Sequence, residues 1–168
     1  MRKNLLIPSI IGFIFVSIIG TLSHFFYDWT GQNVLIGLVT PVSESVWEHM
    51  KLAFFPMILY IFLEKLWLKE KTPFSTCINL ISVLIATFLI PVRYYTYSGI
   101  LGKHSMILDI ATFFYSIFSA FVFRYVAAKK GWQPKHCWLF YTLVVATTVA
   151  FLVFTYYPPA LGIFQSQP

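Results

Sequence analysis

The chain has 168 residues, of which 58% are hydrophobic and only 11% are charged, and its mean hydropathy is +0.76. A soluble domain carries about a quarter charged residues, so this composition excludes an ordinary water-soluble fold and predicts an integral membrane protein. The net charge of +6 does not indicate a nucleic-acid partner, because the basic residues stand mostly at the ends of apolar runs. No polar stretch is long enough for a second domain, so we expect one transmembrane domain over residues 1–168.

Five apolar segments are long enough to cross a bilayer, which takes about 20 helical residues. We therefore predict an all-α bundle with spans at about 5–24, 48–68, 74–93, 105–126 and 137–156. The first segment is too long for the apolar part of a signal peptide, and no cleavage site follows it, so we interpret it as an uncleaved span. The short run 34–41 cannot cross a membrane and is predicted to be interfacial or re-entrant.

The boundaries of the second and third helices follow from polar residues. We predict that the second helix begins at Ser43, whose side chain would cap it, with Glu44 in the first turn near the positive end of the helix dipole. On such a helix Glu44 and Glu48 would share one face, and His49 would lie on the adjacent face. The segment 69–73 is predicted to be a polar turn, and the third span is predicted to end at Arg93.

The distribution of basic residues predicts the orientation. With the N-terminus in the cytoplasm, nine Lys and Arg fall on the inner face and three on the outer face: Arg2, Lys3, Lys65, Lys69, Lys71, Arg124, Lys129, Lys130 and Lys135 inside, and Lys51, Arg93 and Lys103 outside. This bias agrees with the positive-inside rule and puts the C-terminus outside, in what we expect to be a plasma membrane. Cys77 and Cys137 then lie near the reducing cytoplasm, and we expect both to be free thiols.

The same orientation gathers most of the ionisable residues in the outer half of the membrane: His24, Asp28, Glu44, Glu48, His49, Arg93, His104 and Asp109. Acids and histidines are costly to immerse in a membrane, so partners are expected for them. The centre of the group is the segment 41–51, and the ends of the first and fourth spans supply His24 and His104.

Three interpretations of this group remain open. In the first, His24, Glu48, His49 and His104 bind a divalent metal such as zinc, and Glu44 or Asp109 is the acid/base of a hydrolase acting on a lipid or lipid-linked substrate. In the second, the same groups form the outer gate of a small-solute or ion transporter. In the third, they are ordinary interfacial residues of a structural or interaction protein, with Glu48 paired to Lys51.

Three segments also resemble a known family. The run Pro41-Val-Ser-Glu-Ser-Val-Trp-Glu-His-Met-Lys51, preceded by His24-Phe-Phe-Tyr-Asp-Trp29 and followed much later by Thr155-Tyr-Tyr-Pro-Pro159, is similar to a family of small bacterial membrane proteins classed only as a domain of unknown function. The resemblance implies a polytopic membrane protein and supports His24, Glu44, Glu48 and His49 as a signature. It implies no activity. Membrane lipids are the partners we expect, and the sequence predicts no oligomeric state.

Overall fold

The apolar runs of the sequence form long helices in the computed structural model, which describes residues 4–69 and 73–166. The helices are α1 (Leu6–Trp29), α2 (Val34–Gly37), α3 (Val46–Leu68), α4 (Thr76–Leu101), α5 (Met106–Lys129) and α6 (Cys137–Phe154), followed by a short 3-10 helix at Gly162–Phe164. Within the described ranges the only β-type pairing is an isolated bridge between Ser45 and Ser166. The all-α prediction is confirmed.

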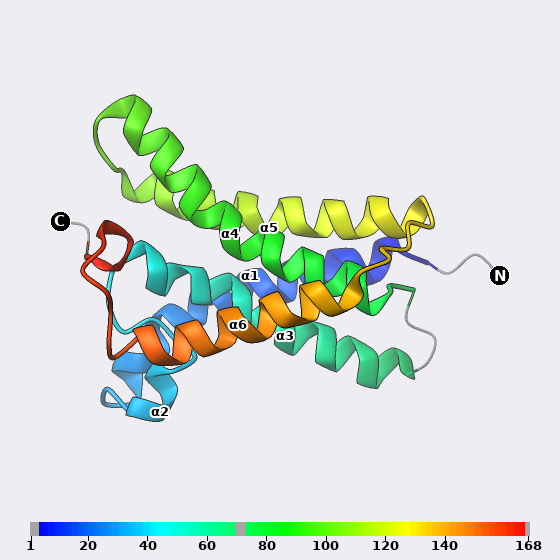
Figure 1. Cartoon of the computed structure of the whole chain (residues 1–168), viewed down its shortest axis with the longest axis horizontal. Helices are drawn as coiled ribbons and strands as arrows, with labels where there is room; N and C mark the ends of the chain where they lie inside the picture. The colour runs from blue at the N-terminus through cyan, green and yellow to red at the C-terminus, as the bar shows by residue number, and fades with distance from the viewer. Residues whose placement is uncertain (1–3, 70–72, 167–168) are drawn as a thin grey trace.

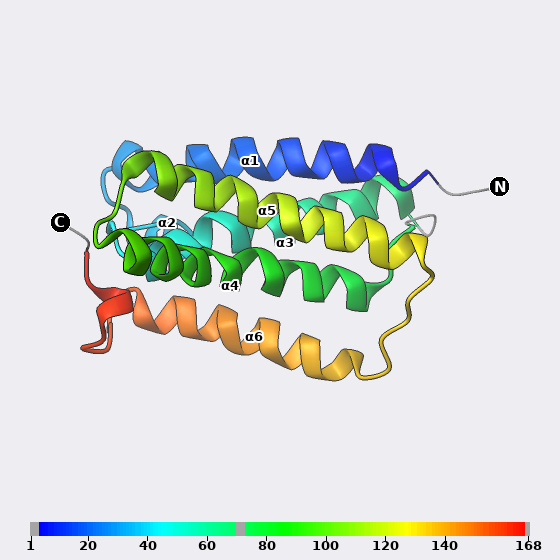
Figure 2. The ribbon, with the colours of Figure 1, turned by 90° about the horizontal axis from the view of Figure 1, so that it is seen from above.

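Five of the helices run side by side along the long axis of the molecule, and the two termini lie at opposite ends (Figures 1 and 2). Four of them, α1, α4, α5 and α6, are long and apolar enough to span a membrane. The fifth, α3, has 23 residues but carries acidic and basic side chains at both ends, which sets it apart from the four candidates. The number of crossings and the end that is cytoplasmic stay predictions.

The helix ends differ from the expected boundaries. The first helix continues five residues past His24 to Trp29, and α4 continues eight residues past Arg93 to Leu101. A hydropathy pattern predicts where a helix leaves the hydrocarbon core of the membrane. The helix itself can continue beyond that point until its backbone is capped. Gly102 supplies that cap with the left-handed φ of 67°, a conformation that glycine adopts without a Cβ clash. The polar turn predicted at 69–73 lies mostly outside the described residues.

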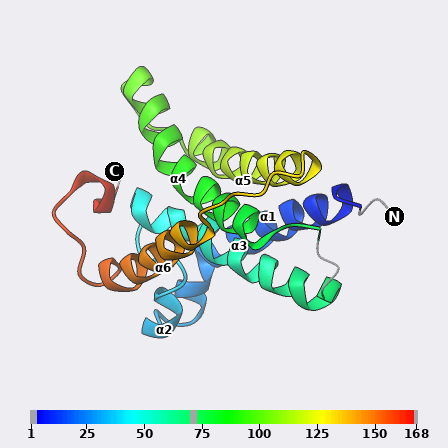
Figure 3. The same cartoon turned by 45° about the vertical axis from the view of Figure 1, so that its right-hand side comes forward.

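Close packing around α1 fixes the centre of the bundle. A Cβ on Gly20 would stand 2.5 Å from the carbonyl oxygen of Leu52 in α3 and 2.6 Å from the ring of Phe113 in α5. A glycine at this position therefore lets α1 approach both helices, as small residues do between membrane helices. Ser116 and Ala120 of α5 are also fully buried. The C-terminal end of α4 and the start of α5 then diverge from α1 and α3 (Figures 1 and 3).

The prediction of two free thiols is wrong, because the structure joins Cys77 and Cys137 in a disulfide. The prediction rested on the expected compartment, because the sequence does not show how close the two cysteines lie in the fold. Each cysteine stands at the beginning of its helix, α4 or α6, and the two Cα atoms are 5.1 Å apart. That separation is within the range that a disulfide spans.

Candidate functional site: a histidine–carboxylate cluster at a cavity

The loop before α3 carries the first residue of the site. This helix begins at Val46, three residues later than expected, and Ser45 is its N-cap, with its hydroxyl accepting from the Glu48 amide at 3.3 Å. The spacing Ser45-x-x-Glu48 is that of a capping box, a signal that our choice of Ser43 overlooked. Because Glu44 precedes the helix, its carboxylate does not share a face with that of Glu48.

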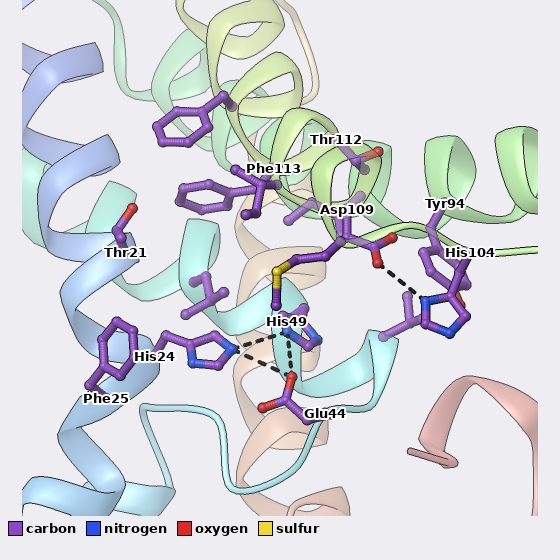
Figure 4. A pocket seen from close by; sticks show the side chains of 16 residues that line it. Thr21, His24, Phe25, Glu44, His49, Tyr94, His104, Asp109, Thr112 and Phe113 are labelled. Atoms are coloured by element: carbon purple, nitrogen blue, oxygen red, sulfur yellow. Dashed lines mark hydrogen bonds and ion pairs between the residues drawn. The ribbon is translucent and has the colours of Figure 1, made fainter. Parts of the chain in front are cut away.

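The carboxylate of Glu44 turns instead towards two histidines from different helices. Its Oε2 lies 3.5 Å from Nε2 of His24, near the end of α1, and 3.3 Å from Nε2 of His49, in the first turn of α3. The two imidazole nitrogens are themselves 3.3 Å apart. Figure 4 shows the three side chains converging on one point. These three groups could hold a metal ion.

The three distances fit a tetrahedral metal site. Zinc binds imidazole nitrogen and carboxylate oxygen at about 2.0–2.2 Å, so two ligands of a tetrahedron stand about 3.3–3.5 Å apart. The edges of the triangle formed by His24, Glu44 and His49 are 3.3, 3.3 and 3.5 Å. Three protein ligands leave the fourth position of a tetrahedron open, which is the arrangement of catalytic zinc sites.

The backbone fixes the tautomer of His49. Its Nδ1 lies 2.8 Å from the carbonyl oxygen of Ser45, and a carbonyl only accepts, so Nδ1 carries the proton and donates. In the neutral ring Nε2 then has its lone pair free to point at the cluster. An outer hydrogen bond of this kind is the usual support of a metal-binding histidine.

The environment of Glu44 favours its ionised form. When the His49 ring is protonated at both nitrogens, its hydrogen bond to Glu44 is the main cause that lowers the pKa of this carboxyl below its usual value of 4.5, burial opposes it, and His24 contributes in the same direction as His49. The side chain of Glu44 is 64% exposed, against about a third for each histidine. A charged carboxylate reachable from outside suits a ligand whose metal arrives from solution.

The cluster lies at the polar end of a cavity of about 540 Å³ between α1, α3, α4 and α5. This volume is within the range of small-molecule sites, about 300–1,000 Å³. Across the cavity, Asp109 accepts a hydrogen bond from Tyr97 through Oδ1 and lies 3.6 Å from Nδ1 of His104 through Oδ2 (Figure 4). All three histidines of the predicted outer group line this one cavity, although His104 pairs with Asp109 and not with the other two. Sequence reasoning overlooked Tyr97, because its helix was expected to end at Arg93.

The structure places Glu48, which we assigned as a metal ligand, in a different pair. Its carboxylate is 3% exposed, accepts from Lys51 at 2.8 Å and from the backbone amide of Val42 at 3.0 Å. Glu44 therefore stands in the group that could hold a metal ion, and Glu48 holds the loop that carries Glu44. The ion pair with Lys51 that the third interpretation proposed is present.

Two of the three family-like segments, 41–51 and 155–159, meet at this ion pair. The fully buried Lys51 also donates to the carbonyl of Gly37 at 3.0 Å and to the hydroxyl of Thr155, with which the last segment begins. The next residue, Tyr156, donates to the carbonyl of Val34 at 2.8 Å. These hydrogen bonds connect the residues after α6 and the turn of α2 to the start of α3. The remaining members of the outer group take no part: Arg93 donates to Ser119 at 2.7 Å on the α4–α5 surface.

Comparison with known proteins extends the resemblance to the whole chain. No curated protein and no solved structure matched it. The model of one family, described as a family of unknown function (DUF6512), matched residues 2–167. The match includes both the cluster and the two segments that meet behind it. The chain therefore belongs to family DUF6512, whose function is unknown.

Proposed function

We propose that the protein binds a divalent transition metal, with zinc the best candidate, at His24, Glu44 and His49, and uses it to hydrolyse an ester bond of a lipid or lipid-linked substrate. The observation that carries the proposal is the triangle of two imidazole nitrogens and one carboxylate oxygen with edges of 3.3, 3.3 and 3.5 Å. Mixed imidazole and carboxylate ligation suits zinc and its neighbours.

The chemistry follows from the two sides of the cavity. A metal in the triangle would supply a Lewis acid and would lower the pKa of a bound water. In hydrolysis the water oxygen would bond to the acyl carbon or phosphorus and lose a proton, the ester bond would break, and the departing alkoxide would take up a proton. The Asp109–His104 pair lines the same cavity, and we assign it the acid/base role of taking the proton from the water and returning it to the alkoxide.

The shape of the cavity favours this proposal over transport. A transport path would continue towards the far end of the bundle, past Asn79 in α4. The lining of the cavity does not include Asn79, whose side-chain oxygen accepts from Arg124 at 2.8 Å in a separate buried cluster. A cavity that is lined by the cluster and not by Asn79 suits an enzyme or a binding protein.

Metal analysis of the purified protein tests the proposal. We expect about one zinc per chain in the wild type, and a loss of most of it in His49→Ala, because two remaining ligands bind zinc weakly. His136→Ala is the matched control, since His136 is exposed at the other end of the molecule, and it should keep the metal. Equal zinc in wild type and His49→Ala, or no zinc in wild type at saturating concentration, would refute the site.

A further inference from the structure

The walls of the cavity are apolar away from the cluster. Leu52 of α3, Ile90 of α4 and Phe113 of α5 form its deeper part, and each is less than 10% exposed. Its polar groups stand at the ends of helices, where a membrane helix reaches the interface: His24 and His49 on one side, Asp109 on the other. A ligand that satisfies both parts has an apolar chain and a polar head.

The rim of the cavity on one side is also apolar and faces outwards. Phe25 of α1 is 47% exposed, and Met106 and Ile110 of α5 are 77% and 52% exposed, although all three line the cavity. Both helices are candidate membrane spans, so exposed apolar side chains on them contact acyl chains of the bilayer. The rim that α1 and α5 contribute is therefore the side from which a lipid can reach the cavity.

We propose that the cavity takes up a phospholipid of the surrounding membrane, which enters between α1 and α5 with one acyl chain in the apolar part and its phosphate at the histidine–carboxylate cluster. The inference names the substrate class of the proposed hydrolase and rests on it for the head-group end. A divalent cation bound by one carboxylate keeps a net positive charge, to which an anionic phosphate oxygen is attracted. A water-soluble substrate would leave the apolar walls against its polar surface, which is unfavourable.

Photo-crosslinking in lipid nanodiscs tests the inference. The probe is a phosphatidylglycerol with a diazirine in one acyl chain, and the readout is crosslinking to Leu52 and Ile90, each 5% exposed and out of reach of lipids that merely surround the protein. We expect crosslinks at both positions. A parallel sample with a diazirine fatty acid should give fewer, and stronger labelling by the fatty acid than by the phospholipid would overturn the proposal, as would labelling of outer surfaces alone.

A matched pair of variants tests the entrance. Ile110→Trp should narrow the opening and reduce crosslinking at Leu52 and Ile90 several-fold, while Ile107→Trp should leave it unchanged, because Ile107 is 78% exposed on the same helix and does not line the cavity. Both variants should bind zinc like the wild type, which shows that they are folded. Equal crosslinking in the two variants would overturn entry between α1 and α5.

The same samples separate this inference from the proposed function. His49→Ala should lose zinc and keep the acyl-chain crosslinks, because Leu52 and Ile90 touch the chain and not the head group. Wild type that crosslinks at both positions and binds no zinc would remove the metal site and keep the lipid site. If the wild type binds zinc and gives no such crosslinks, the metal site is kept and the lipid site is refuted.

Discussion

Both ends of the bundle hold ionisable side chains. Those at one end are buried and paired, whereas those at the other are partly exposed and line a cavity. At the N-terminal end, Glu64 of α3 forms an ion pair with Arg124 of α5, and both are at most 2% exposed. Asn79 accepts from the same guanidinium, which lies 3.7 Å from the ring centre of Phe74, and Tyr60 donates to Glu64 at 3.2 Å. At the other end, His24, Glu44 and His49 are a third to two thirds exposed and face a cavity.

The difference separates a closed, paired network from a candidate binding site. Buried charges in a membrane protein must be paired inside the protein, and the Glu64–Arg124 cluster is paired from four helices and closed to lipid and water. The histidine–carboxylate cluster has three possible ligand atoms close together beside a cavity. Both clusters consist of ionisable residues and look alike in the sequence. Only exposure and a neighbouring cavity distinguish the histidine–carboxylate cluster as the one that could bind a ligand.

The largest expected effect is at the closed end. Arg124→Met leaves Glu64 buried without its partner, and breaking a buried pair in this way costs about 3–5 kcal/mol of folding free energy. We expect a large drop in the thermal unfolding temperature in detergent, with zinc binding by the folded fraction unchanged. The double variant Arg124→Met/Glu64→Leu should recover part of the loss, since it removes both charges. A single variant as stable as Lys129→Met, an exposed control, would contradict the structural role of the pair.

Substitutions at the helix caps of α3 and α4 form a matched pair, and we expect them to have an effect of intermediate size. Ser45 caps α3 beside the site, and Ser75 caps α4 at the other end; each hydroxyl accepts from a backbone amide at 3.3 Å. Replacement of either by alanine should cost about 1 kcal/mol. Only Ser45→Ala should also weaken zinc binding, because it frees the loop of Glu44 and the Ser45 carbonyl that orients His49. Equal zinc affinity in the two variants would show that the loop does not position the ligands.

The smallest expected effect is the acid dependence of the metal-free protein. The pKa of Glu44 is lower in the folded state than its usual 4.5, so this pairing stabilises the fold above that pH and is lost as pH falls through the folded pKa. Because the side chain is well exposed, we expect only about 0.2–1 kcal/mol. Unfolding measured between neutral and acid pH should show this component in the wild type and not in Glu44→Gln. An identical pH profile for both proteins would contradict the pairing.

Composition and periodicity alone were sufficient for the fold class. Long apolar runs in a chain with few charges can bury their backbone polar groups only as helices in lipid, which is why an all-α membrane bundle could be predicted without any contact information. The same reasoning located the polar group at one end of the bundle, because His24, the segment 41–51 and His104 all adjoin the ends of apolar runs. The family-like segments drew attention to the same residues.

The roles within the site depended on tertiary structure. Whether Glu44 or Glu48 reaches the histidines follows from the start of α3 at Val46 and from the buried Lys51, which takes the carboxylate of Glu48. Lys51 is held there by groups more than ten residues before it and more than a hundred after it, Gly37 and Thr155. The disulfide of Cys77 and the Glu64–Arg124 pair likewise join residues 60 positions apart. Local sequence fixes which helices form, but the packing of distant segments decides which side chains meet.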